Sequence, residues 1–349
     1  MTKETQQPVD HSHLALFAGM GGFIAASNRV GFRTVFANEF ESSCVAILRE
    51  SFPNVPVSPK DIRHLEAGDL RDVLGEVDVL SAGFPCQSFS QAGNNKGFDD
   101  DRGKLFFEIT RVSGLLDDPP KILLLENVPF LAQFNKGERL SVILNHLRKA
   151  GYWVSKSNCF ILNSKDIAGS PQNRERLFIV ACHSKYFRRN PFASAPAKAK
   201  KQLELWDLVN RDEKQSDKVY LSEESKYYLM ISKSIETHSS DVLHQLRRSF
   251  VRPCPQGVCP TLTANMGGGG HNVPFLRDKF GIRRLTSDEC LLLQGYLSGE
   301  VVFPDHTLES AKLMMIGNSI QVSLCELIFS QIREKLEELK NENRVAISA

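Results

Sequence analysis

The sequence lacks the features that mark membrane-spanning, secreted and metal-binding proteins. No apolar run approaches the roughly 18 residues that a membrane-spanning helix needs. The first thirteen residues are polar and contain no apolar core of a signal peptide, which argues against secretion. The cysteines are scattered, and the one close pair, Cys254 and Cys259, has no second pair or histidine doublet beside it. We therefore expect free thiols, no metal, no membrane and a cytoplasmic location.

The chain also has little net charge, but its charges are unevenly distributed. Its 349 residues carry a net charge of +2. Between residues 185 and 284, 18 Lys and Arg stand against 10 Asp and Glu, so this segment has a net charge of +8 and the remainder −6. A basic segment in an otherwise acidic chain favours a polyanionic partner, although a solvated loop region could have this composition by chance.

The first forty residues fit a nucleotide-binding βαβ unit. An apolar run at 13–17 precedes a glycine-rich turn, a short helix at 24–28 and a second strand at 33–36. Glu39 follows about twenty residues after the turn begins, where a carboxylate can accept ribose hydroxyls. The glycines are not spaced as G-x-G-x-x-G and no G-K-[ST] follows, which argues against NAD and against a P-loop. A plain structural turn remains the alternative.

A cysteine follows the strand predicted at 77–80, in the stretch SAGFPCQSFS. Pro85 cannot donate to a strand ladder and should end the strand, which leaves Cys86 on a loop where α/β sheets bind ligands. A deprotonated thiol is a good nucleophile, so Cys86 is a candidate nucleophile, and a buried structural cysteine is the alternative. The polar loop at 91–101 fits either a lid or ordinary surface.

Charged side chains also stand at the ends of two later strands. The apolar strand at 120–125 delivers Glu126, whose carboxylate could act as an acid in low-dielectric surroundings or simply cap a helix. Arg174 and Arg176 should share one strand face, where two guanidiniums suit a carbonyl oxygen, a phosphate or a carboxylate, or else surface ion pairs. Farther on, the glycines at 267–270 form either a base-reading loop or a flexible hairpin.

These segments resemble, in the same order, the motifs of the C5-cytosine DNA methyltransferases. The matching stretches are FAGMGGF, SPKDI, GFPCQSFS, ENV, QNRER and GNS. The resemblance implies S-adenosylmethionine as the methyl donor. It implies that this cofactor is bound by Phe17, Gly19, Met20, Gly22, Glu39, Phe40, Asp61, Ile62 and Asn318. Without the resemblance, Asp61 would be an ordinary helix-capping candidate.

The resemblance also implies a mechanism. Cys86 would attack C6 of a cytosine flipped out of the duplex, Glu126 would contact N3 and the exocyclic amine, and C5 would take the methyl group. Arg174 would hold O2 of the base, and Arg176 would support the loop or the adduct. Double-stranded DNA is the expected partner. A cognate restriction endonuclease is possible without a stable complex, and a monomer is the default.

The expected fold class is α/β, with a Rossmann-like S-adenosylmethionine-dependent methyltransferase domain and a smaller, irregular target-recognition domain. We expect the catalytic domain at 1–184, the target-recognition domain at 185–284, and a return to the catalytic domain with a C-terminal helix at 285–349. An RNA cytosine methyltransferase acting on transfer RNA, and a non-catalytic DNA-binding module, are the alternatives. Labelling of transfer RNA against DNA, and an active-site titration, would separate them.

Overall fold

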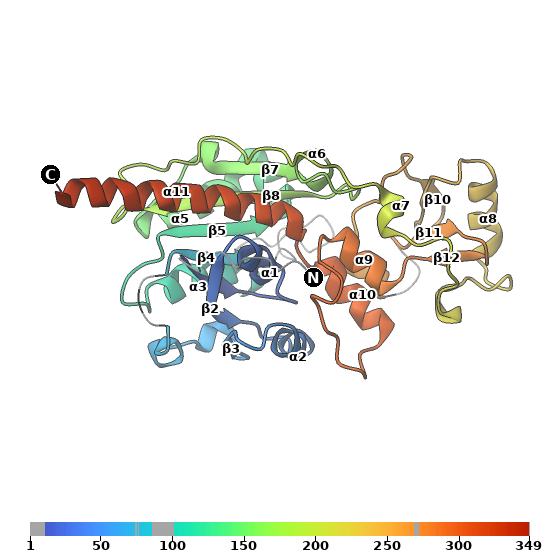
Figure 1. Ribbon diagram of the computed structural model, residues 1–349, viewed down its shortest axis with the longest axis horizontal. Helices are drawn as coiled ribbons and strands as arrows, with labels where there is room; N and C mark the ends of the chain where they lie inside the picture. Colours follow the sequence, from blue (N-terminus) through green and yellow to red (C-terminus); the bar gives the residue numbers. More distant parts are fainter. Residues whose placement is uncertain (1–10, 74, 76, 86–100, 269–271, 349) are drawn as a thin grey trace. The chain divides into compact units, whose positions relative to one another are not determined.

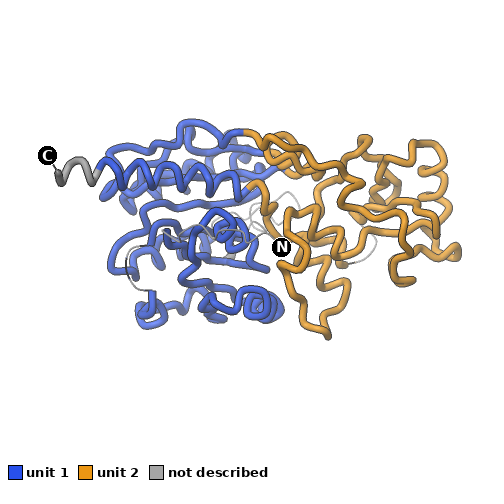
Figure 2. The backbone as a smooth tube through the Cα atoms, viewed as in Figure 1, with its two compact units in different colours: residues 1–162, 175–197, 325–349 blue, residues 163–174, 198–324 orange. Residues whose placement is uncertain are grey.

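The computed structural model describes residues 11–73, 75, 77–85, 101–268 and 272–348, with side chains except at 101–103 and 343–348. The chain divides into two compact units (Figure 2). Unit 1 comprises residues 1–162, 175–197 and 325–349, and unit 2 comprises residues 163–174 and 198–324. Residues 285–324, which the sequence assigned to the catalytic domain, thus group with the smaller unit.

Unit 1 is built on a mixed eight-stranded sheet (Figure 1). The strand order is β3-β2-β1-β4-β5-β8-β6, and β7 pairs with β8. Strands β3 to β5 run parallel, whereas β8 is antiparallel to both β5 and β6. The strands are β1 (His11–Leu16), β2 (Phe32–Asn38), β3 (Val57–Ser58), β4 (Val79–Gly83), β5 (Ile122–Asn127), β6 (Tyr152–Trp153), β7 (Cys159–Asn163) and β8 (Glu175–His183). The α/β class expected from the sequence is confirmed.

Helices cover both faces of this sheet because its central strands are apolar on both sides. The helices of unit 1 are α1 (Gly22–Arg29), α2 (Ser42–Ser51), α3 (Asp101–Ser113), α4 (Phe130–Gln133), α5 (Glu138–Lys149) and most of α11 (Val322–Ser348). On one face, alternate residues of β1, β4 and β5 form a core with the buried side chains of α3 and α5. On the other face, Phe329 of α11 packs edge-on against His13 of β1 and Phe23 of α1.

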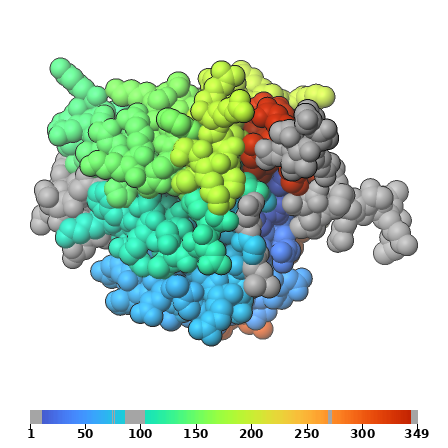
Figure 3. All heavy atoms as spheres, turned by 90° about the vertical axis from the view of Figure 1, so that its left-hand side faces the viewer, coloured from blue at the N-terminus to red at the C-terminus, as the bar shows by residue number. Residues whose placement is uncertain are grey.

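On one face of unit 1, the chain segments follow one another in the same order as the strands of the sheet. In Figure 3 the segments before residue 75, those around α3 and β5, and those around α5 to β7 succeed one another from blue through teal to green. This is the order in which the strands lie from β3 across to β8.

Unit 2 holds a second, four-stranded sheet of order β10-β9-β11-β12, all antiparallel. Its strands are β9 (His244–Leu246), β10 (Val251–Pro253), β11 (Pro274–Arg277) and β12 (Ile282–Arg284). Its helices are α6 (Ser164–Ile167), α7 (Leu205–Leu208), α8 (Tyr228–Glu236), α9 (Ser287–Leu293) and α10 (Glu309–Asn318). A capping box formed by Thr286 and Glu289 starts α9.

One stretch, Glu309–Glu342, is long and apolar enough by composition to cross a membrane, contrary to our reading of the sequence. It spans α10 and most of α11, and 67% of its most apolar window is buried inside the protein. Packing against the rest of the chain therefore accounts for its apolar side chains.

Candidate active site

Most of the residues singled out in the sequence lie at one edge of the large sheet. Strands β1, β2, β4 and β5 are parallel, so the segments that follow them emerge at the same edge. Strand β8 runs the opposite way, and its first residues therefore begin there too. The strand order reverses between β1 and β4, and ligands of such sheets bind outside the carboxyl ends at this point.

The glycine turn after β1 is tied directly to Glu39. The Gly19 amide donates to Glu39 Oε2 at 2.7 Å, and the Glu41 amide donates to Glu39 Oε1 at 2.8 Å. Gly19 has a φ of +55°, and a Cβ at this position would meet nothing within 4 Å. Phe17 precedes it with a φ of +51°. The turn thus leaves open space beside a carboxylate whose position is fixed.

The neighbouring residues of the turn serve packing. Met20 is buried, and Gly22 is the first, buried residue of α1. Gly21, which we did not single out, has a φ of +88°, and a Cβ there would lie 2.3 Å from Cε2 of Phe52. Two consecutive glycines in a turn before a helix were the available signal. Because neither the φ nor the space admits a side chain, Gly21 fixes how the turn enters α1.

Two further candidates extend this side of the site. Phe40 directly follows Glu39, and its side chain is 67% exposed. Asp61 accepts hydrogen bonds from the backbone and guanidinium of Arg63, which lower the pKa of its carboxyl to about 2. Asp61 thereby caps the short 3-10 helix that begins at Ile62, and Ile62 itself is buried. The capping interpretation of Asp61 is therefore confirmed.

Glu126 lies beside the strand end that leads toward Cys86. Gly83, the last residue of β4, pairs with Glu126 on β5, and a Cβ on Gly83 would lie 3.5 Å from Glu126 Oε2. The residue that follows β4 is held in place as well, because the Asn127 side chain donates to the Phe84 carbonyl at 3.1 Å. Phe84 is buried against α3.

Cys86 lies outside the described residues. So does the loop predicted at 91–101, except for residue 101. The other seven cysteines are free thiols, six of them buried. Burial raises the pKa of Cys44 to about 12 and that of Cys159 and Cys254 to about 11. Thiols that stay protonated are poor nucleophiles, so burial argues against a catalytic role for Cys44, Cys159 and Cys254.

The two arginines that we expected on one strand face have different surroundings. Strand β8 begins at Glu175, so Arg176 lies within it and Arg174 precedes it. Arg176 Nε lies 3.0 Å from Glu126 Oε1, and both side chains are largely buried, at 16% and 11% exposed. A guanidinium and a carboxylate thus meet at the sheet edge, and both can hydrogen-bond to a polar heterocycle.

Arg174 is buried within unit 2 and binds backbone carbonyls. Its guanidinium donates to Leu262 O at 2.6 Å, to Ser319 O at 2.5 Å and to Gly317 O at 3.3 Å. Gln172, two residues earlier, similarly joins the Leu262 amide to the Leu293 carbonyl. These contacts connect three distant segments of unit 2. Asn318, the last residue of α10, is exposed in the same unit.

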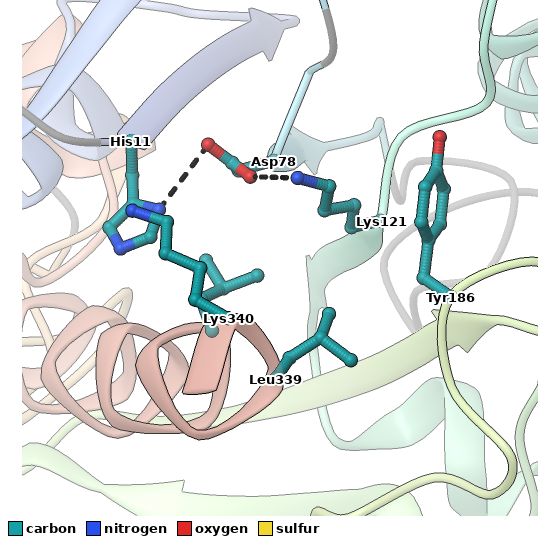
Figure 4. Close-up of a pocket in the computed structure, with 7 residues that line it drawn as sticks. His11, Asp78, Lys121, Tyr186, Leu339 and Lys340 are labelled. Carbon is teal, nitrogen blue, oxygen red and sulfur yellow. Dashed lines mark hydrogen bonds and ion pairs between the residues drawn. The ribbon is translucent and has the colours of Figure 1, made fainter. Parts of the chain in front are cut away.

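A pocket of about 110 Å³ lies at the opposite edge of the sheet, where β1, β4 and β5 begin (Figure 4). Asp78 binds Lys121 at 2.9 Å and lies 3.4 Å from His11 Nδ1, while His11 Nε2 lies 2.7 Å from Glu337 of α11. Leu336 and Leu339 of α11 line the other side. The polar groups of this pocket therefore join α11 to the sheet and take no part in the candidate site.

Comparison with known proteins agrees with this arrangement. The sequence model of the C-5 cytosine-specific DNA methylase family matches residues 12–334. The chain is 36% identical over 328 residues to the type II methyltransferase M.Bsp6I of Bacillus sp. strain RFL6, covering 92% of this chain and 98% of that protein. It is 32% identical over 346 residues to M.HpaII of Haemophilus parainfluenzae, covering 93% and 89%.

Solved structures support the fold. The Entamoeba histolytica methyltransferase EhMeth superimposes with a TM-score of 0.70 at 16% identity, covering 95% of this chain and 99% of that one. The S. pombe Dnmt2 methyltransferase gives a TM-score of 0.68 at 19% identity, covering 94% and 99%. The expected Rossmann-like methyltransferase fold is confirmed.

Proposed function

Because this chain belongs to the C-5 cytosine-specific DNA methylase family and is a DNA cytosine methyltransferase, we propose that it methylates C5 of one cytosine within a short, specific DNA sequence, using S-adenosylmethionine. The observation that carries the residue assignment is the Glu126–Arg176 pair beside the strand end that leads to Cys86. The type II relatives support a modification role in a restriction-modification system, in the cytoplasm of a bacterium. We expect a monomer and a cognate endonuclease that forms no stable complex with it.

The edge formed by β1 and β2 fits the methyl donor. The Glu39 carboxylate, held by two backbone amides, would accept the ribose hydroxyls. Phe17 and the exposed Phe40 would flank the adenine, and Gly19 lets the backbone approach closely. From the family resemblance we further assign Met20, Gly22 and Ile62 to the lining of this cofactor site. Asp61 would accept a hydrogen bond from the adenine amine, and Asn318 would be a further residue that contacts the donor. When bound, the sulfonium supplies an electrophilic methyl group.

The other half of the edge would activate the base. Cytosine C5 is a poor nucleophile because the ring is aromatic. Addition of the Cys86 thiolate to C6 breaks the aromaticity and shifts electron density toward N3 and C5. Glu126 would hydrogen-bond N3 and the exocyclic amine, which stabilises this shift. After C5 has been methylated, loss of its proton and departure of Cys86 restore the aromatic ring.

We assign the contact to O2 of the base to Arg176, and the organisation of the small unit to Arg174. Arg176 already lies beside Glu126, so a base bound by that carboxylate would present its O2 edge within reach of a guanidinium. Arg174 instead donates hydrogen bonds to three backbone carbonyls of unit 2. The cytosine must leave the base stack to reach these groups, at a cost of about a few kcal/mol that contacts with DNA would offset.

The test is transfer of a radiolabelled methyl group from S-adenosylmethionine to plasmid DNA and, in parallel, to transfer RNA, followed by nucleoside analysis. We expect 5-methylcytosine in DNA alone, and its loss in Cys86→Ala and Glu126→Gln. Label in transfer RNA alone would replace the proposal by the RNA alternative. Full turnover by Cys86→Ala would exclude the covalent mechanism.

A further inference from the structure

Unit 2 contains a long segment without acidic residues. The 36 residues from 242 to 277 include four arginines and no Asp or Glu, and so supply half of the +8 charge of residues 185–284. Three of the four, Arg247, Arg248 and Arg252, stand within six residues of one another. Neighbouring like charges repel one another unless an anion lies between them. A polyanion is therefore the partner that this segment fits.

These arginines surround the turn of the β9–β10 hairpin. The last ladder pair joins Leu246 and Val251, and the Arg247 amide donates to the Phe250 carbonyl at 2.8 Å, so Arg248 and Ser249 form the centre of the turn. Pairing between β9 and β11 ends at Gln245 and Pro274. Residues 247–250, which we call the hairpin tip, thus lie beyond the last pair of that ladder.

The side chains of the hairpin differ in how they are held. Gln245 is buried, and its Oε1 accepts from Arg252 Nη2 at 2.6 Å and from Arg247 Nη1 at 3.4 Å. Two guanidiniums are thereby oriented by one neutral amide oxygen, and within the described part of the chain no carboxylate pairs with either of them. Among the described residues, Arg248 has no hydrogen-bond or ion-pair partner. Phe250 is 54% exposed and makes no ring contact within the described chain.

We propose that the hairpin tip enters the major groove of the DNA substrate and reads its sequence, an inference that rests on the proposed function. The major groove admits a two-stranded β-ribbon, and a bidentate contact from arginine to guanine is the commonest specific contact there. Arg248 is the base-reading residue, and Phe250 makes an apolar contact with a neighbouring base. Arg247 and Arg252, oriented by Gln245, bind the flanking phosphates.

Among the nearby glycines, Gly267 has a different explanation. A Cβ on Gly267 would lie 2.1 Å from the Ser310 carbonyl oxygen and 2.7 Å from Cβ of Met314. Close packing against α10 therefore accounts for Gly267, whereas Gly269 and Gly270 lie outside the described residues. The hairpin tip, unlike Gly267, offers side chains that can tell one base pair from another.

The experiment compares Arg248→Ala, Phe250→Ala and a matched control, Lys279→Ala. Lys279 is an exposed cation of the same unit whose charge is already paired with Asp212 at 2.6 Å. Each variant is expressed in a methylation-free bacterial host, and the host DNA is bisulfite-sequenced to give the methylated sequences. Thermal melting and binding of S-adenosylhomocysteine show that the fold and the cofactor site are intact.

We expect Arg248→Ala to lose discrimination at one base pair by about 5- to 150-fold, the range for a lost bidentate contact. Phe250→Ala should weaken discrimination at an adjacent position, and Lys279→Ala should keep the wild-type sequence preference. Arg247→Ala with Arg252→Ala should lower activity on all sequences alike and flatten the salt dependence. Wild-type preferences and rates in both tip variants would overturn the assignment while leaving the proposed function in place. Absence of methylated DNA with the wild-type chain would overturn both.

Discussion

Replacing Arg174 and Arg176 separately by methionine should have opposite consequences. Methionine keeps an unbranched apolar stem and removes one charge in each case. Arg174 makes two short hydrogen bonds, at 2.5 and 2.6 Å, and a longer one at 3.3 Å, all to carbonyls. Hydrogen bonds from a charged group contribute about 1.5–3 kcal/mol each, so losing the two short ones should cost about 3–6 kcal/mol.

That loss is large beside a typical total stability of about 5–15 kcal/mol. Arg174→Met should therefore lower the melting temperature by at least about 4 °C. Below that temperature the remaining folded enzyme should still transfer methyl groups. Arg176→Met loses the ion pair with Glu126 and one hydrogen bond, to the Glu175 carbonyl, and should melt closer to the wild type than Arg174→Met. It should nevertheless lose most of its methyl transfer, which Arg176→Lys should restore in part.

The measurements are urea or thermal unfolding and methyl transfer per folded molecule, for both variants at one temperature. The expected result is an unstable but active Arg174→Met and a more stable but inactive Arg176→Met. If Arg174→Met melts like the wild type yet fails to transfer methyl groups, the assignment of the two arginines is reversed. Our first expectation, in which Arg174 holds the base, would then stand.

Other predictions concern the cofactor edge and the core. Glu39→Gln should weaken S-adenosylhomocysteine binding by about 10- to 100-fold in calorimetry, because a charge-assisted hydrogen bond becomes a neutral one; unchanged affinity would exclude Glu39 as the ribose acceptor. Gly21→Ala should cost more stability than Gly299→Ala, since both have positive φ but only Gly21 meets a neighbour, at 2.3 Å; equal melting temperatures would contradict this. Burial lowers the pKa of His13 to about 3. Protons then bind the unfolded chain first, so stability should fall as the pH drops below about 6.5, by about 1.4 kcal/mol per unit, and His13→Asn should reduce that slope in urea titrations at pH 7 and 5.

Much of the catalytic unit is predictable from local patterns. The strands predicted at 13–17, 33–36, 77–80 and 120–125 are confirmed as β1, β2, β4 and β5, with bounds shifted by a few residues. The loops that follow neighbouring parallel strands emerge at the same edge of the sheet. Glu39 and Glu126 could therefore be expected at the same edge. The large-sheet part of the site therefore follows from chain order and strand ends.

The division of labour between Arg174 and Arg176 could not be predicted in the same way. The alternation of side chains along a strand assigns both arginines to one face. However, β8 begins at Glu175, so Arg174 lies outside the strand and the alternation does not apply to it. Its partners Leu262 and Ser319 lie about 90 and 145 residues away, and no local pattern reveals such contacts. The grouping of residues 285–324 with unit 2 could not be predicted from local patterns either. It depends on contacts between residues far apart in the sequence, such as the packing of Gly317 against the Thr263 backbone.

The central claim is methylation of cytosine C5 within one short DNA sequence by a Cys86-dependent reaction. Bisulfite sequencing of DNA from a methylation-free bacterial host, expressing either the wild-type chain or Cys86→Ser, tests it most directly. We predict that the wild type protects cytosines within a single short sequence and that Cys86→Ser protects none. Absence of protection with folded wild-type protein, or equal protection by Cys86→Ser, would contradict the account.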